Sequence, residues 1–161
     1  GDRSDIRVLL GLESRIKDYE GRVDAPKDAL RGAKIRIASV HRFPFGRRLF
    51  DGGQFKKDIC QDMELELSLA AIECGECNVL GHAGGMSLLY HRDFPLKHFE
   101  AIITACTKKG VAFELNCAYH LPVLRHLKKT LKQYDPLVSF GSDAHAIAEV
   151  GMWASMLNKD Q

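Results

Sequence analysis

The sequence predicts an α/β fold in which parallel strands alternate with helices. Short β-branched or apolar runs recur along the chain, and longer segments with apolar residues at helical spacing separate the later ones. Strands joined through helices form right-handed crossovers, so the sheet should be parallel, either open or curled into a barrel. A length of 161 residues with 45% hydrophobic residues suits one soluble domain spanning residues 1–161.

The expected elements follow in chain order. Strands are predicted at residues 6–13, 34–41, 78–83, 111–116 and 137–145. Helices are predicted at residues 55–74, 95–109 and 121–133, and Gly110 is placed to end the second of them in a left-handed cap. Residues 43–53 form the longest predicted loop, and such long loops often carry function.

Charge and cysteine content narrow the possible partners and compartment. A formal net charge of +2 gives no indication of nucleic-acid binding, and the apolar runs are too short for a membrane span. The five cysteines are an odd number in a chain without a signal-peptide pattern, which favours a reducing cytoplasm. The Cys-x-x-Cys spacing of Cys74 and Cys77 has no second pair nearby, so a structural role is expected.

Ionisable side chains lie at the carboxyl end of every predicted strand, where a buried strand would not select them. In parallel α/β folds these ends form one face, so residues distant in sequence converge there. The residues in question are Glu13, His41, His82, Glu114 with Asn116, and Asp143 with His145.

Imidazoles and carboxylates without a thiolate favour Zn²⁺, Mn²⁺ or Fe²⁺ over Ca²⁺. Such a metal activates water near neutral pH, and several metals can clamp the oxygens of an in-line displacement, so hydrolysis is the expected chemistry. For the last strand an alternative remains open. Asp143 could instead cap a helix predicted at residues 146–157, because Asp is a favoured N-cap residue.

Five motifs together resemble the PHP family, the polymerase and histidinol phosphatase domain. They are "LLGLE", "IASVHRFPF", "VLGHAGG", "FELN" and "FGSDAH", and they extend from Glu13 to about Gly151. The resemblance implies an incomplete distorted (β/α)7 barrel with up to three divalent metal ions that hydrolyse a phosphoester.

The resemblance also implies a role for each matching residue. Glu13 corresponds to a carboxylate shared by two metals, and His41 and His82 to the imidazoles that complete one of those sites. Asp143 corresponds to a ligand of the other metal and His145 to a ligand of the third, so both would act in catalysis through metal-bound water.

The chain departs from the family at its beginning, where a His-x-His strand is expected and no histidine precedes Glu13. We therefore expect the chain to be the C-terminal two-thirds of a complete domain, and to be inactive by itself. Three explanations are open for the upstream ligands: they were cut off, another chain supplies them, or the protein has lost them.

A phosphorylated small molecule is the expected substrate, and phosphate recognition requires cations near the metals. Arg42 and Arg48 flank His41 together with Arg47, Arg92 follows His82, and Asn116 shares the face of the fourth strand. His120 lies near that strand end as a further candidate, and Trp153 is expected in the core.

Two functions remain open from sequence. One is a metal-dependent phosphoesterase acting on a phosphomonoester or nucleotide. The other is a non-catalytic structural or regulatory PHP module of a larger protein such as a DNA polymerase. An exonuclease would need a basic face, which 23 basic against 21 acidic residues do not indicate.

Overall fold

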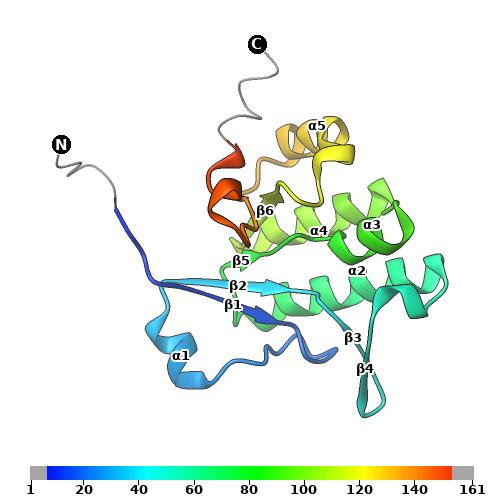
Figure 1. The fold of residues 1–161 in the computed structure, drawn as a ribbon, viewed down its shortest axis with the longest axis horizontal. Coiled ribbons are helices and arrows are strands. Elements are labelled where there is room, and N and C mark those ends of the chain that lie inside the picture. Colours follow the sequence, from blue (N-terminus) through cyan, green and yellow to red (C-terminus); the bar gives the residue numbers. More distant parts are fainter. Residues whose placement is uncertain (1–6, 154–161) are drawn as a thin grey trace.

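The computed structural model describes residues 7–153, which form a five-stranded parallel sheet with helices (Figure 1). The predicted α/β class is thereby confirmed. The sheet order is β1-β2-β5-β6-β7, and every neighbouring pair is parallel. The strands are β1 (Gly11–Arg15), β2 (Ile35–Ser39), β5 (Val79–Leu80), β6 (Ala112–Asn116) and β7 (Val138–Gly141).

The three predicted helices are present as α2, α4 and α5, side by side along one face of the sheet (Figure 1). Their bounds are α2 (Lys57–Cys74), α4 (Leu96–Lys109) and α5 (Leu124–Tyr134), and a 3-10 turn, η2 (Leu121–Val123), leads into α5. Gly110 ends α4 with φ 67°, as expected for a left-handed cap.

Several short elements were not predicted. The expected loop at residues 43–53 is a hairpin of β3 (Phe43–Phe45) and β4 (Arg48–Phe50) followed by a 3-10 turn, η1 (Gly52–Gln54). Gly46 has φ 61° at the hairpin turn, where a glycine avoids steric strain. Two short helices, α1 (Lys27–Gly32) and α3 (Gly85–His91), contain too few turns to show a clear periodicity.

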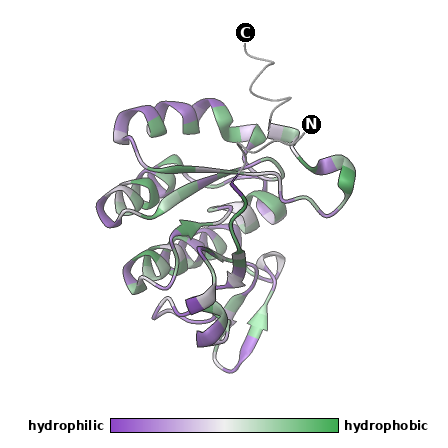
Figure 2. Ribbon diagram, turned by 90° about the vertical axis from the view of Figure 1, so that its left-hand side faces the viewer, coloured by the Kyte–Doolittle hydropathy of each residue, from purple (hydrophilic) through white to green (hydrophobic). Residues whose placement is uncertain are grey.

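The core lies between the sheet and the helices that cover it. Phe99, Ile102 and Ile103 of α4 are fully buried and belong to the same cluster as Phe113 of β6 and Leu67 of α2. Hydrophobic and hydrophilic residues alternate along these helices, as an amphipathic face requires (Figure 2). Trp153 is buried as expected and donates a hydrogen bond from its indole to the carbonyl of Gly141.

Three strands differ clearly from their predicted bounds, and one of them is β5, which was predicted at residues 78–83 and comprises only Val79–Leu80. β1 begins at Gly11 and continues to Arg15, so Glu13 lies mid-strand, because Gly11–Arg15 is the segment in register with Ile35–Ser39. β7 ends at Gly141, and the predicted extension to residue 145 is wrong. Asp143 has φ 51°, which is incompatible with a continuing strand.

The helix predicted at residues 146–157 is a 3-10 turn, η3 (Ile147–Glu149), within the described part, and residues 154–161 lie outside it. Within residues 7–153 the sheet is open, with β1 and β7 at its edges, and no closed barrel forms. No helix of the described residues is long and apolar enough to cross a membrane.

Candidate metal centre

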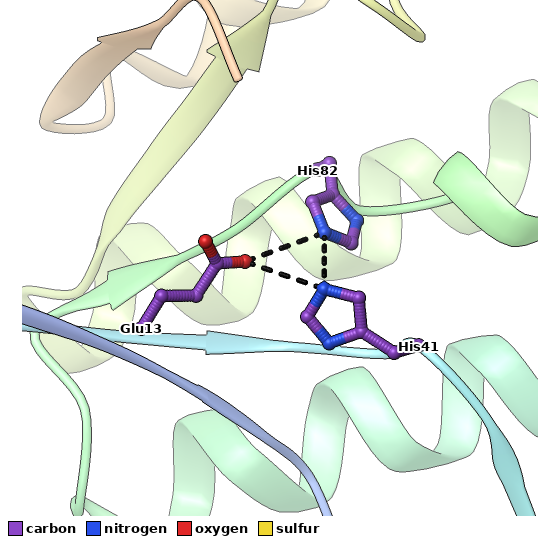
Figure 3. A group of neighbouring side chains, drawn as sticks. All are labelled: Glu13, His41 and His82. Atoms are coloured by element: carbon purple, nitrogen blue, oxygen red, sulfur yellow. Dashed lines mark hydrogen bonds and ion pairs between the residues drawn. The ribbon is translucent and has the colours of Figure 1, made fainter. Parts of the chain in front are cut away.

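Three ionisable side chains converge at one end of the sheet: Glu13, His41 and His82 (Figure 3). Oε1 of Glu13 lies 3.5 Å from Nε2 of His41 and 3.5 Å from Nε2 of His82. The two Nε2 atoms are 3.3 Å apart. One carboxylate oxygen and two imidazole nitrogens therefore form a nearly equilateral triangle.

The triangle has the dimensions of a divalent metal site. Zinc bonds of about 2.0–2.1 Å in a tetrahedral site place neighbouring ligand atoms about 3.4 Å apart. The observed edges of 3.3 to 3.5 Å match that separation. The donor set of one carboxylate and two imidazoles also suits zinc and related transition metals. The residues present thus fit such an ion without rearrangement.

Glu13 is positioned by its neighbour on β2. Ser39 donates a hydrogen bond from Oγ to Oε1 of Glu13 at 2.7 Å. Gly81 follows β5 beside this pair, and a Cβ atom at Gly81 would overlap Oγ of Ser39. A glycine at this position therefore leaves the space that the serine hydroxyl needs to orient the carboxylate.

His82 is held in an unusual backbone conformation by Glu114. Its φ is 25°, which is strained for a residue with a side chain, and its amide donates to Oε2 of Glu114 at 2.7 Å. The side-chain amide of Asn116 donates from Nδ2 to the same oxygen at 3.2 Å. Gly141 of β7 lies against Glu114, where a Cβ atom would overlap Oε1.

His120 stabilises the segment that carries His82 through a second set of contacts. It is fully buried, and its Nε2 donates to the carbonyl of Ala83 at 2.8 Å while its Nδ1 accepts the amide of Asn116 at 3.1 Å. Its ring stacks on Phe113. Burial lowers the pKa of His120 to about 4, so the imidazole is neutral and its two nitrogens have fixed roles. Both are occupied within the protein, which makes His120 a support rather than a ligand.

The charges of the triangle are coupled. The hydrogen bond from His82 lowers the pKa of Glu13 to about 2, with Ser39 and His41 acting in the same direction against burial. Burial lowers the pKa of His82, but Glu13, Glu114 and Asp143 outweigh it and raise that pKa above its ordinary value. Burial and the nearby His82 lower the pKa of His41. Glu13 is therefore ionised at neutral pH and supplies the negative charge that a cation needs.

Nδ1 of His82 is buried and has no hydrogen-bond partner among the described residues. Histidines that bind a metal through one nitrogen usually donate the other to a carbonyl or carboxylate. The orientation of His82 thus depends on its backbone, on the ring of Tyr119, whose centroid lies 5.2 Å away, and on the close approach of Gly85.

Asp143 and His145 are placed differently from the triangle. The charge of Asp143 acts to raise the pKa of both His41 and His82, although at His41 burial and the nearby His82 outweigh it. The imidazole of His145 is mostly exposed, and its Nδ1 lies 2.8 Å from the carbonyl of Asp143. Asp143 does not cap the following turn, because Ala146 is the N-cap of η3 and Glu149 accepts the amides of His145 and Ala146.

The residues expected to bind substrate are also spread out. Arg42 pairs with Asp51 at 3.2 Å, and Arg48 is exposed on the β3–β4 hairpin. Asn116 is buried, and its side chain is occupied by Glu114 and by the amide of Ala118. Arg92, just after α3, lines a pocket beside Tyr119.

One buried carboxylate escaped sequence reasoning. Glu64 of α2 is fully buried and accepts hydrogen bonds from the amides of Met86 and Ser87 and from the hydroxyl of Ser87. It anchors α3 directly after the loop that carries His82. Glu64 is the one carboxylate among the buried positions of α2, and a charged residue at a core position of the helical pattern is the signal that could have revealed it.

Comparisons with known proteins identify similar chains but no family model that matches. The chain is 29% identical over 158 residues to a protein of Caldicellulosiruptor bescii named "probable phosphatase", covering 91% of this chain and 56% of the relative. It is 30% identical to a protein of the same name from Caldicellulosiruptor saccharolyticus, covering 87% of this chain and 54% of the relative. The chain spans about half the length of these curated relatives.

Solved structures share the fold at low sequence identity. A Listeria monocytogenes protein named as a histidinol phosphatase has a TM-score of 0.61 at 16% identity, covering 81% of this chain and 60% of that one. Histidinol phosphate phosphatase from Lactococcus lactis, solved with zinc, L-histidinol and phosphate, has a TM-score of 0.60 at 16% identity. That alignment covers 98% of this chain and 68% of the other. At 16% identity these two structures show only that the fold is shared.

Proposed function

We propose that the chain is part of a metal-dependent phosphatase of the PHP family that hydrolyses a small phosphomonoester. The observation that carries the proposal is the Glu13–His41–His82 triangle, whose edges suit a divalent metal. Relatives named probable phosphatase and a shared fold with histidinol phosphatases support the reaction class.

The three residues of the triangle would hold the metal. A divalent ion there supplies a Lewis acid for a phosphoryl oxygen and lowers the pKa of a coordinated water. Glu13 contributes a full negative charge at neutral pH because its pKa is held near 2. His41 is kept neutral by its lowered pKa and offers Nε2 as a ligand atom.

Asp143 and His145 would complete the centre as further ligands. Support comes from the charge of Asp143, which acts on the pKa of both His41 and His82. Such an effect requires the Asp143 carboxyl to lie near the two imidazoles. His145 would have to turn inward from its exposed position, and its Nδ1 would have to leave the carbonyl of Asp143.

Arg92 is the best placed of the arginines to contact substrate, because it lines the pocket next to Tyr119. A guanidinium matches phosphate oxygens in a two-point contact. Arg42 is partly neutralised by Asp51, so its role would be weaker, and Arg48 would reach substrate only from the hairpin. Asn116 would act through Glu114 on the backbone of His82.

The proposal is tested on the protein expressed from its complete reading frame, with 4-nitrophenyl phosphate and added Zn²⁺ or Mn²⁺. We expect metal-dependent hydrolysis that Glu13→Gln reduces by about 100-fold or more, since a weakened ligand set costs both affinity and rate. Glu66→Gln, an exposed change on α2, is the matched control and should retain activity.

Metal binding without any turnover of phosphoesters would contradict the proposal and favour the non-catalytic module. Full activity in Glu13→Gln would instead remove the triangle from the catalytic machinery.

A further inference from the structure

A small pocket adjoins the candidate metal centre. It has a volume of about 150 Å³ and lies between the end of α3 and the segment after β6. Its lining residues are Leu88, Leu89, Arg92, Ala118, Tyr119 and Pro122.

Tyr119 connects the pocket to the metal centre. The same ring that lines the pocket lies with its centroid 5.2 Å from that of His82, tilted by 47°. The charges of Asp143 and Glu13 both raise the pKa of the Tyr119 hydroxyl, although burial is the larger cause. A molecule whose phosphoryl group reaches the triangle could therefore place its organic part in the pocket.

The space inside the pocket suits one ring or a short branched chain, and a larger organic part would extend out of it into solvent. An apolar protein cavity of about 150 Å³ holds a single benzene molecule. A nucleoside is far larger than this space, because it joins a ribose to a base.

The lining is mostly apolar, and its polar side-chain groups are the guanidinium of Arg92 and the hydroxyl of Tyr119. The amide of Ala118 donates to the side chain of Asn116, and the amide of Arg92 donates to the carbonyl of Leu88. A sugar placed here would lose water from its hydroxyls without gaining enough partners. An apolar ring would gain from burial against Leu88, Leu89 and Pro122.

Arg92 is the one charged residue among the described residues that line the pocket. Among the described lining residues no carboxylate is present to pair with an ammonium or imidazolium group, and the guanidinium of Arg92 disfavours such a group in the pocket. The ligand of the Lactococcus lactis structure, L-histidinol, carries an amine and an imidazole. The pocket of this chain is poorly suited to such a cation.

We infer that the substrate is a phosphomonoester whose alcohol is a single apolar ring, or a branched alkyl group of similar size, without a positive charge. This inference rests on the proposed function and extends it to the substrate class. The pocket between α3 and the segment after β6 binds the leaving alcohol, and the Glu13–His41–His82 triangle lies at the phosphoryl end.

The kinetic test compares benzyl phosphate with ethyl phosphate, because their alcohols have similar acidity and differ mainly in the ring. Histidinol phosphate and adenosine monophosphate complete the panel. In the protein from the complete reading frame we expect kcat/KM for benzyl phosphate to exceed that for each of the others by about tenfold or more.

Ala118→Leu fills the pocket without removing a backbone hydrogen bond, so it should reduce the benzyl-to-ethyl ratio by about fivefold or more. Ala101→Leu is the matched control, since Ala101 is exposed on α4 away from the pocket lining. Hydrolysis of all four esters at similar rates would overturn the inference and leave the proposed function standing.

A binding measurement tests the pocket independently of turnover. The fluorine NMR signal of 4-fluorobenzylphosphonate, a stable mimic, should broaden or shift with the protein. Ala118→Leu should raise its dissociation constant by about fivefold or more, and Ala101→Leu should leave it unchanged. No binding, or equal binding by both variants, overturns the inference whether or not any ester is hydrolysed.

Discussion

Two of the three residues of the candidate centre, Glu13 and His82, are held by residues that would not contact the metal. Ser39 orients Glu13, Glu114 holds the amide of His82, and His120 fixes the carbonyl of Ala83. Such supporting contacts usually matter nearly as much as the ligands, because they fix distance and orientation before the metal arrives.

The pH dependence of stability should reveal His120. Its pKa is about 4 in the folded state and about 6.5 unfolded, so both states are neutral above pH 6.5 and no stability depends on pH there. Below pH 6.5 the imidazole of His120 binds a proton in the unfolded state but stays neutral in the folded state until the pH approaches 4. Folding should therefore lose on the order of 2 kcal/mol from this group between pH 7.5 and pH 5.

Urea unfolding of the metal-free protein at the two pH values measures this loss. His120→Gln should be less stable at pH 7.5 and should show a smaller further loss at pH 5. His126→Gln, an exposed change on α5, should keep the wild-type difference. An unchanged difference in His120→Gln would show that His120 is not the group responsible.

Gly141 is expected to be needed for the hydrogen bond between Glu114 and the backbone amide of His82. In Gly141→Ala the added Cβ atom pushes the carboxyl of Glu114 away from the amide of His82. A buried amide without a partner costs about 1–3 kcal/mol. We expect that loss in urea unfolding, together with weaker zinc binding by calorimetry.

Gly32→Ala is the matched control, since a Cβ atom at Gly32 meets nothing within 4 Å. Equal behaviour of the two alanine variants would mean that Glu114 tolerates displacement and does not position His82.

The sequence predicts which residues lie at the strand ends, but it does not predict the residues that hold their side chains in position. The motifs pointed to Glu13, His41 and His82, and the structure brings their side chains together. The strained φ of His82 and the hydrogen bond from Ser39 depend on distances between strands. The spacing of apolar residues along the sequence carries no information about those distances. Asp143 and His145 were expected on one face by strand alternation, an argument that does not apply beyond Gly141.

At the scale of elements, α2 and α3 are joined by one buried carboxylate. Glu64 accepts three hydrogen bonds at the start of α3, from two amides and one hydroxyl. Its pKa is raised by burial, which these bonds oppose. The helix that carries Leu88 and Leu89 of the pocket therefore depends on a residue more than twenty positions earlier in the chain.

Glu64→Ala should destabilise the protein strongly, because it leaves buried donors without an acceptor. The expected loss in the free energy of unfolding is about 3 kcal/mol or more, and Glu64→Gln, which keeps one acceptor oxygen, should lose less. Glu66→Ala, an exposed change on the same helix, should stay within about 0.5 kcal/mol. Denaturant unfolding of the three variants decides whether this anchor operates.

Long elements were predictable and short ones were not. α2, α4 and α5 have enough turns for an apolar face to be visible in sequence, and their predicted bounds are close to those observed. The sequence predicts a loop where the hairpin of β3 and β4 forms, because three residues per strand show no alternation. The sequence predicts too early a start for β1, because the apolar run begins at residue 6 whereas pairing with β2 begins at Gly11.

At the scale of the whole molecule, the open sheet brings its ligands from three strands that are adjacent in space and distant in sequence. Glu13 is on β1, His41 follows β2 and His82 follows β5, which are consecutive in the sheet order. A metal bound by all three would therefore tie together segments that separate on unfolding, so it should stabilise the folded state as a ligand does.

Zinc should accordingly raise the melting temperature of this chain. At a free concentration of about 100 times the dissociation constant, one site contributes about 2.7 kcal/mol, which for a chain of this size corresponds to roughly 5–10 °C. His41→Gln should abolish the increase, because it removes one corner of the triangle at a partly exposed position. Cys74→Ser should not, since Cys74 is an exposed thiol outside the triangle. Calorimetric melting with and without zinc, with EDTA as the metal-free reference, provides the measurement. A shift lost in Cys74→Ser and kept in His41→Gln would assign the bound zinc to surface thiol chemistry and remove the triangle as a metal site.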